Sequence, residues 1–296
     1  MASSSHPPKV KRARPLLGTL VEIRVEGMSE DAAQNAINAG FETIEKIHKL
    51  MSFHEAESDL TALNTTAHQR PVSVHAYTYA VLESALAFAR DSKGVFDPTV
   101  GYDLVKAGVL PRPNSMQEPD TSACWRDVEL LPERYVRFHK PLWIDLGGIA
   151  KGFAVDKAVE SLAAPPEVQL CVNAGGDLRV SGPAAELVRL DARIGDAEIP
   201  VLKIENGSIA SSSGYARGGQ AEPQQAAAHL HGVRRTAVGE RSFVSVLAED
   251  CLSADALTKI VLALGPQADA FLWRCGATAL LHNARDGWRT LGLGND

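Results

Sequence analysis

The pattern of apolar and polar residues predicts a strand followed by a helix near the start of the chain. Val21, Ile23 and Val25 fall on one face of an extended segment, and charged residues occupy the positions between them, an alternation typical of a half-buried strand. From Glu30 to about Leu50 the apolar residues recur at helical spacing, which predicts an amphipathic helix. We expect the basic segment 1–14 to be a disordered arm before the strand.

Helix and strand patterns follow one another irregularly along the rest of the chain. A second helix is predicted from about Ala76 to Ser92 and another over 253–265, whereas Trp143 to Glu160 has the pattern of a buried strand, a Gly-Gly corner and a helix. Short strand patterns crowd together between 168 and 207. This mixture, which lacks strict βαβ alternation, predicts an α+β or mixed α/β fold with mixed sheets flanked by helices rather than a Rossmann fold.

Length and composition indicate a single compact unit with a large core. The chain has 296 residues, of which 45% are hydrophobic and 22% charged, a composition that argues against disorder over most of the length. We expect residues 15–296 to form one domain made of two intimately packed subdomains. A proline-rich segment at 104–126 is expected to be a lid, and an Ala- and Gln-rich segment at 218–228 a polar linker.

Charge and cysteine content limit the classes of function that the sequence favours. A formal net charge of -6 argues against a dedicated nucleic-acid-binding protein, so small-molecule chemistry is favoured. The four cysteines lie far apart with no C-x-x-C pair, which gives no indication of a zinc site. No stretch is long and apolar enough to cross a membrane, and no signal-peptide core is seen, so a cytoplasmic location is expected.

Two glycine pairs stand at the ends of predicted strands and have carboxylates beside them. They are Gly147-Gly148 and Gly175-Gly176. Glycine lets the backbone approach a ligand closely, and the N–H groups at a helix start attract phosphate oxygens. Lys151 would add positive charge to such a phosphate cradle. The alternative, which turn chemistry leaves equally open, is a tight corner in which Lys151 pairs with Asp156 on the surface.

Three aspartates are set among apolar neighbours and favour the ligand-binding interpretation. They are Asp97, Asp145 and Asp255, each next to a turn or a helix start. A buried carboxylate is costly unless it is paired or hydrogen-bonded, so three of them suggest one polar cleft. Any one alone could be a structural cap, since Asp97 before Pro98 is also a plausible turn former. Hard oxygen ligands of this kind suit magnesium better than zinc.

Seven motifs together resemble the ApbE family. In chain order they are MSFHEAESDLTALN, GVFDPTVG, IDLGGIAKGFAVD, VNAGGDLRVSG, SIASSSGY, HLHGVRR and SADALTKIVLALG, and they extend over roughly Leu16 to Gly265. The resemblance implies an ApbE-like fold and the activity of an FAD:protein FMN transferase. Such an enzyme uses magnesium and moves the FMN half of FAD onto a Ser or Thr hydroxyl of an acceptor flavoprotein, as a phosphoester, with release of AMP.

The resemblance also implies roles for individual residues. His229 resembles the general base, while Lys151 and the metal at Asp255 would stabilise charge on the phosphate oxygens. The expected metal ligands are the carbonyl of Ala150, the carboxylate of Asp255 and the hydroxyl of Thr258. The residues expected to contact FAD are Asn64, Asp97, Asp145, Gly147, Gly148, Lys151, Asp156, Gly175, Gly176 and Asp177.

The chain departs from the family pattern on the metal helix. The family usually has threonine four residues after the metal aspartate, but here that position is Lys259 and the threonine is Thr258. Thr258 could serve as a ligand after a small rotation, or the Lys259 ammonium could partly substitute for the cation and weaken metal binding. A simple i,i+4 pair of Asp255 with Lys259 is the third account, worth about 0.2–0.5 kcal/mol if exposed.

A second departure affects the histidine motif. The family pattern H-x-x-D-P-R-T-G has become HLHGVRRT, in which only Arg234 stays in register. Either His229 or His231 could be the base, because residues two apart share a strand face. Two alternative functions therefore stay open: a flavin-binding relative without transfer activity, and a pyrophosphatase that cuts FAD to FMN and AMP.

Overall fold

The structure of the protein is a computed structural model that describes residues 8–113, 117–190, 199–214, 229–239 and 241–294. The linker expected at 218–228 lies outside the described residues. Among the described helices, none is both long and apolar enough to span a bilayer.

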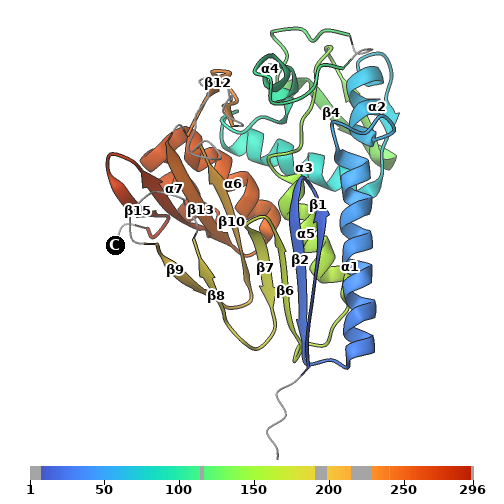
Figure 1. Cartoon of the computed structure of the whole chain (residues 1–296). Coiled ribbons are helices and arrows are strands. Elements are labelled where there is room, and N and C mark those ends of the chain that lie inside the picture. Colours follow the sequence, from blue (N-terminus) through green and yellow to red (C-terminus); the bar gives the residue numbers. More distant parts are fainter. Residues whose placement is uncertain (1–7, 114–116, 191–198, 215–228, 240, 295–296) are drawn as a thin grey trace, which may run out of the picture.

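An antiparallel sheet of eight strands organises the molecule (Figure 1). Its strand order is β1-β2-β6-β7-β10-β13-β14-β15, so the N-terminal hairpin lies at one edge and the C-terminal hairpin at the other. The strands are β1 (Lys9–Leu16), β2 (Thr19–Glu26), β6 (Gln169–Ala174), β7 (Asp177–Ser181), β10 (Gly207–Ser213), β13 (Ser242–Ala248), β14 (Thr278–Asn283) and β15 (Gly287–Leu291).

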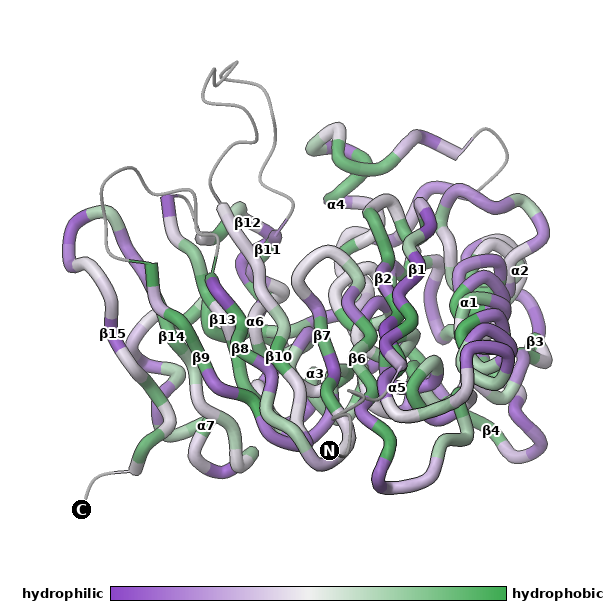
Figure 2. The backbone as a smooth tube through the Cα atoms, turned by 60° about the horizontal axis from the view of Figure 1, so that its bottom comes forward, coloured by the Kyte–Doolittle hydropathy of each residue, from purple (hydrophilic) through white to green (hydrophobic). Residues whose placement is uncertain are grey.

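Three helices pack against one another and against one face of this sheet. They are α1 (Glu30–Met51), α5 (Ala150–Ser161) and α6 (Cys251–Leu264). Hydrophobic and hydrophilic positions alternate along α1 (Figure 2), which buries Ile37, Phe41 and Ile44. The helix therefore stands where its periodicity predicts, with its apolar stripe against the core. The short helix α7 (Asp269–Arg274) precedes β14.

A smaller core lies on the other face of the sheet. In β6, Leu170 and Val172 belong to the main core, whereas Cys171 between them packs with Leu178 and Ile204. Successive residues of a strand point to opposite faces, so the second cluster lies across the sheet from the helices. The hairpin of β8 (Glu186–Arg189) and β9 (Val201–Ile204) covers it.

A second region surrounds a three-stranded sheet of order β3-β5-β4. Its elements are β3 (Val72–Ser73), β4 (Val128–Leu131), β5 (Tyr135–Phe138), α2 (Asp59–Thr66), α3 (Ala76–Asp91) and α4 (Gly101–Lys106). Short 3-10 turns stand at Pro98–Val100, Trp125–Asp127, Pro132–Arg134 and Gly265–Ala268, and a small ribbon pairs β11 (Leu230–His231) with β12 (Thr236–Ala237). One continuous core joins this region to the large sheet. The predicted α+β fold class is confirmed.

The prediction of a disordered arm over residues 1–14 is wrong from Lys9 onward. Residues 9–14 belong to β1, which pairs along its whole length with β2. Val10 is buried in the main core, and Lys9 and Lys11 form ion pairs with Glu26 and Glu22 on β2. The basic residues are therefore cross-strand partners of acidic ones, a stabilising arrangement in a sheet.

The predicted buried strand at Trp143–Leu146 is buried but belongs to neither sheet. Its backbone is paired in other ways: the Ile144 N–H donates to Oδ1 of Asn64 at 2.7 Å, and Nδ2 of Asn64 donates to the Ile144 carbonyl at 3.0 Å. The Asp145 N–H donates to the carbonyl of Pro98 at 2.8 Å. These bonds satisfy the backbone groups that a sheet partner would otherwise satisfy.

Candidate active site

Two cavities meet at the corner that leads into α5. The serine cavity, of about 330 Å³, is lined by Ser211, Ser212 and Ser213 of β10 and by Asp97, His229 and Lys259. The helix cavity, of about 520 Å³, is lined by the C-terminal end of α1 and the following residues, including Ile47, Met51 and Phe53. Their shared wall consists of Leu110, Asp145, Gly147 and Lys151. Together they form one elongated site with a charged middle.

The Gly147-Gly148 corner places Lys151 and Asp145 in that middle. Helix α5 begins at Ala150, so Lys151 is in its first turn. The Gly147 N–H donates to Oδ2 of Asp145 at 3.1 Å. Burial raises the pKa of Asp145 to about 6, against the opposing effects of the Gly147 N–H, His54 and Lys259. Near neutral pH this carboxyl can therefore take up or release a proton.

Lys151 forms an ion pair with Asp177, the first residue of β7. The interpretation that Lys151 pairs with Asp156 on the surface is therefore wrong. Asp177 is buried, and its other oxygen accepts the Ser211 N–H at 3.3 Å. Burial alone would lower the pKa of Lys151, but the carboxylates of Asp177 and Asp255 raise it above the ordinary value. The lysine is a permanent positive charge beside the shared wall.

Asp255 and Lys259 form a second buried ion pair, one turn apart on α6. The other carboxylate oxygen of Asp255 accepts the Gly152 N–H at 3.1 Å, which ties the starts of α5 and α6 together. Burial opposes the ionisation of Asp255, yet Lys151 and Lys259 hold its pKa below the ordinary value. Lys259 also donates to Oγ of Ser212 at 3.1 Å. The site thus contains two lysine–aspartate pairs, Lys151 with Asp177 and Lys259 with Asp255.

The residues expected to hold magnesium do not fit a divalent ion as they are arranged. Both carboxylate oxygens of Asp255 already accept hydrogen bonds. The Thr258 hydroxyl donates to the Asp255 carbonyl at 2.7 Å and bonds to Ser212 at 2.8 Å. Across the described residues, no group of three or more His, Cys, Asp or Glu side chains could hold a metal. The Lys259 ammonium stands where a cation would need to approach Asp255.

Five of the residues expected to contact FAD lie outside the lining of both cavities, namely Asn64, Asp156, Gly175, Gly176 and Asp177. Asn64 anchors the segment at Ile144, and Asp156 accepts the N–H groups of Cys251 and Leu252 at 3.0 and 2.8 Å, at the start of α6. Gly175 and Gly176 make the turn between β6 and β7, where both have positive φ. Only glycine adopts that conformation readily, so the turn itself explains why glycines occupy these two positions.

Asp97 lines the serine cavity, and its partner is a residue that the sequence analysis did not single out. Arg235 donates to Oδ2 of Asp97 at 2.9 Å and to the Thr99 hydroxyl at 3.1 Å. Burial raises the pKa of Asp97 despite Arg235. A Cβ at Gly232 would lie 2.2 Å from the Gly94 carbonyl oxygen. Because this chain has glycine where the family pattern has aspartate, the HLHGVRR segment can pack against Asp97. Asp97 and Arg235 are 138 positions apart in the chain, so no local sequence pattern predicts that they pair.

The structure distinguishes the two histidines. His229 lines the serine cavity together with Lys259. His231 is buried, and its Nδ1 accepts the N–H groups of Val233 and Arg234 at 3.2 and 3.4 Å, so it closes the turn between β11 and β12. Burial, aided by Lys259, lowers the pKa of His229 to about 3. His229 is therefore an uncharged imidazole at neutral pH, in reach of the cavity.

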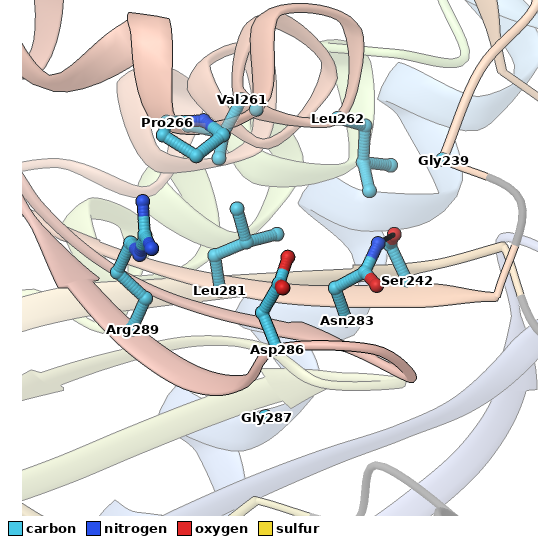
Figure 3. A pocket seen from close by; sticks show the side chains of 11 residues that line it. Gly239, Ser242, Val261, Leu262, Pro266, Leu281, Asn283, Asp286, Gly287 and Arg289 are labelled. Atoms are coloured by element: carbon cyan, nitrogen blue, oxygen red, sulfur yellow. Dashed lines mark hydrogen bonds between the residues drawn. The ribbon is translucent and has the colours of Figure 1, made fainter.

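A third cavity lies apart from this site. It has about 190 Å³ and sits between α6 and the hairpin of β14 and β15 (Figure 3). Asn283, Asp286 and Arg289 line it, and it contains none of the predicted site residues. The chemistry-bearing residues thus gather around the serine and helix cavities.

The fold and the two adjoining cavities define an α+β protein with an elongated site whose shared wall contains Asp145 and Lys151. The chain belongs to the ApbE family, whose sequence model matches residues 17–281. The FAD:protein FMN transferase of Treponema pallidum is 27% identical over 296 residues, covering 89% of this chain and 81% of that protein. The FAD:protein FMN transferase of Chlamydia trachomatis is 25% identical and covers 84% and 82%, respectively.

Solved structures agree with this membership. The ApbE protein of Thermotoga maritima superimposes with a TM-score of 0.83 at 25% identity and covers 95% of this chain and 96% of its own. The flavin transferase ApbE of Vibrio cholerae gives a TM-score of 0.78 at 20% identity, covering 96% of each chain, and supports the fold.

Proposed function

We propose that this chain is an FAD:protein FMN transferase, which transfers FMN from FAD to a Ser or Thr hydroxyl of an acceptor flavoprotein. One observation carries the proposal: the serine and helix cavities share a wall at Asp145, Gly147 and Lys151. A dinucleotide has two bulky ends joined by a diphosphate, so it matches two cavities with a lysine in the wall between them. The relatives named above carry this activity in their names.

The transfer step follows from the chemistry of a diphosphate. The acceptor hydroxyl oxygen attacks the phosphorus that carries riboflavin, and a phosphoester bond forms. The bond from that phosphorus to the bridging oxygen breaks, and AMP leaves with the bridging oxygen and its electron pair. Lys151 and Lys259 would stabilise the negative charge that gathers on the phosphate oxygens, as fixed charges in a site shielded from water do.

His229 is the residue placed to take the hydroxyl proton. It is uncharged at neutral pH, so a ring nitrogen is free to accept a proton. Burial, and after it Lys259, lowers its pKa to about 3, which is below the range for efficient proton transfer. A diphosphate bound next to Lys259 would offset the part of this lowering that the lysine charge causes, and so raise the pKa of His229.

Magnesium dependence, which the family resemblance implies, stays a prediction. Since the carboxylate of Asp255 and the hydroxyl of Thr258 already have partners within the protein, the proposed step relies on the two lysines for charge stabilisation.

The test is incubation of the full chain with FAD and a family-type acceptor flavoprotein, followed by intact-mass measurement of the acceptor. We expect the acceptor to gain one FMN phosphoester and an equal amount of AMP to appear. His229→Asn should lower the transfer rate by about 10²–10⁴-fold and leave FAD bound, because it removes only the proton acceptor. His139→Asn changes an exposed histidine that pairs with Glu129 and is the matched control.

Two other results would contradict the proposal in different ways. Tight FAD binding with an unmodified acceptor, whether EDTA or magnesium is present, would indicate a flavin-binding relative without transfer. Accumulation of free FMN and AMP in the absence of acceptor would indicate a pyrophosphatase.

A further inference from the structure

The side chain of Lys259 is held in place by its contacts and is not a mobile surface lysine. Its side chain is 14% exposed, and its ammonium contacts Asp255 and donates to Oγ of Ser212 at 3.1 Å. A Cβ built on Gly148 would lie 3.6 Å from Cγ and Cε of Lys259, so the lysine stem runs directly beneath the glycine corner. The ammonium is thereby held at the floor of the serine cavity.

Each carboxylate oxygen of Asp255 already has a partner within the protein. One oxygen contacts Lys259 and the other accepts the Gly152 N–H. Thr258 is fully buried, and its hydroxyl is directed to the Asp255 carbonyl and to Ser212. A divalent ion at Asp255 would have to displace the ammonium or stand beside it, and two cations in contact repel one another.

The charge balance agrees. Lys151 pairs with Asp177 and Lys259 pairs with Asp255, so these two ion pairs together carry no net charge. A lysine ammonium is a compact charge with three donors that can bind phosphate oxygens. It can therefore supply the positive charge that a diphosphate needs at this place.

We propose that the Lys259 ammonium takes the place of a divalent ion in this chain and binds the diphosphate of FAD directly, so that FAD binding requires no metal. The inference rests on the proposed function for the identity of the ligand. It assigns Lys259 as a substrate-binding residue and makes this chain a metal-independent member of its family.

The test uses the metal-free full chain and two readouts that do not depend on turnover. Mn²⁺ binding is titrated by electron paramagnetic resonance, and FAD affinity is measured by fluorescence in EDTA and in magnesium. We expect the unchanged protein to show no Mn²⁺ site at micromolar concentrations and to have FAD affinities equal within about twofold in the two buffers.

Variants at Lys259 separate its charge from its shape. Lys259→Thr restores the family residue and should gain a Mn²⁺ site and bind FAD at least about tenfold more weakly in EDTA than in magnesium. Lys259→Met keeps a long stem beneath Gly148 and should lose FAD affinity about tenfold or more in both buffers without gaining a metal site. Lys203→Thr, a change at an exposed lysine paired with Glu205, should behave as the unchanged protein.

Several outcomes would overturn the inference. One is a micromolar Mn²⁺ site in the unchanged protein that Asp255→Asn abolishes; another is an FAD affinity that falls about tenfold or more in EDTA. FAD transfer that occurs only with magnesium would leave the proposed function intact and defeat this inference. FAD binding that needs no metal, without any transfer, would support this inference and contradict the proposed function. A chain with no affinity for FAD in either buffer would defeat both.

Discussion

At the scale of one residue, Asp145 is a carboxylate whose charged form is disfavoured by burial in the site. Asp145 lines both cavities, and within the described part of the chain its carboxylate accepts a hydrogen bond from the N–H of Gly147. The nearby side chains that favour its ionised form are His54 and Lys259. Their attraction does not offset the loss of water, so the pKa of Asp145 rises to about 6.

A pH-dependent gain in stability should follow from Asp145→Asn. Because the folded protein holds this proton more tightly than the unfolded chain, the carboxyl group lowers stability as pH rises from about 4 to about 6. The asparagine should therefore raise the free energy of unfolding at pH 8, by about 2–3 kcal/mol, and have little effect near pH 4. Urea unfolding at both pH values measures the difference.

The exposed change Asp91→Asn, at the end of α3, is the matched control for that measurement. A gain at Asp145 that is the same at pH 8 and pH 4 would contradict the electrostatic explanation and indicate a packing effect.

At the scale of elements, the site depends on the crossing of α5 and α6. Gly152 lies at the contact: its N–H donates to Asp255 at 3.1 Å, and a Cβ there would lie 2.1 Å from the Cys251 carbonyl oxygen. Asp156, one turn further along α5, accepts the first two N–H groups of α6 and pairs with Arg179 at 2.6 Å. The two helix starts are thus locked together, which brings Lys151 next to Asp255.

Gly152→Ala should separate these helices. The new methyl group would overlap backbone atoms that cannot rotate away, so we expect the free energy of unfolding to fall by about 1–3 kcal/mol or more. FAD affinity should fall as well, because Asp255 loses its fixed position. Thermal unfolding and FAD titration measure the two effects. Gly207→Ala, where the nearest atoms to a new Cβ are 3.7 Å away, should change neither. An unaffected Gly152→Ala protein would contradict the close approach.

At the scale of the whole molecule, local patterns predicted the elements better than the contacts between them. The helix predicted from Glu30 to about Leu50 is Glu30–Met51, because its periodicity is set by burial of one face. The segment at Trp143–Leu146 was misassigned as a strand, since an apolar run has the same pattern whether its backbone pairs with a strand or with Asn64.

Because local patterns do not show contacts between distant segments, only some of the site residues could be predicted. Spacing along one helix suggested the pair of Asp255 and Lys259, four positions apart. Lys151 and Asp177 are 26 positions apart and meet only because α5 packs against β6 and β7. The family resemblance supplied the place of His229, while the turn that uses His231 and directs Arg235 to Asp97 required the fold.

The double cavity, built from segments across the whole chain, predicts how FAD compares with its two halves. FMN and AMP each offer one end and one phosphate, whereas under the proposed function FAD would fill both cavities and place its diphosphate at the wall that they share, beside Lys151. Linking two ligands removes one loss of translational freedom on binding, so FAD should bind at least about tenfold more tightly than FMN or AMP alone. Calorimetric titration of each ligand tests this. FMN affinity equal to that of FAD would place the adenosine half outside the site and contradict a dinucleotide that spans both cavities.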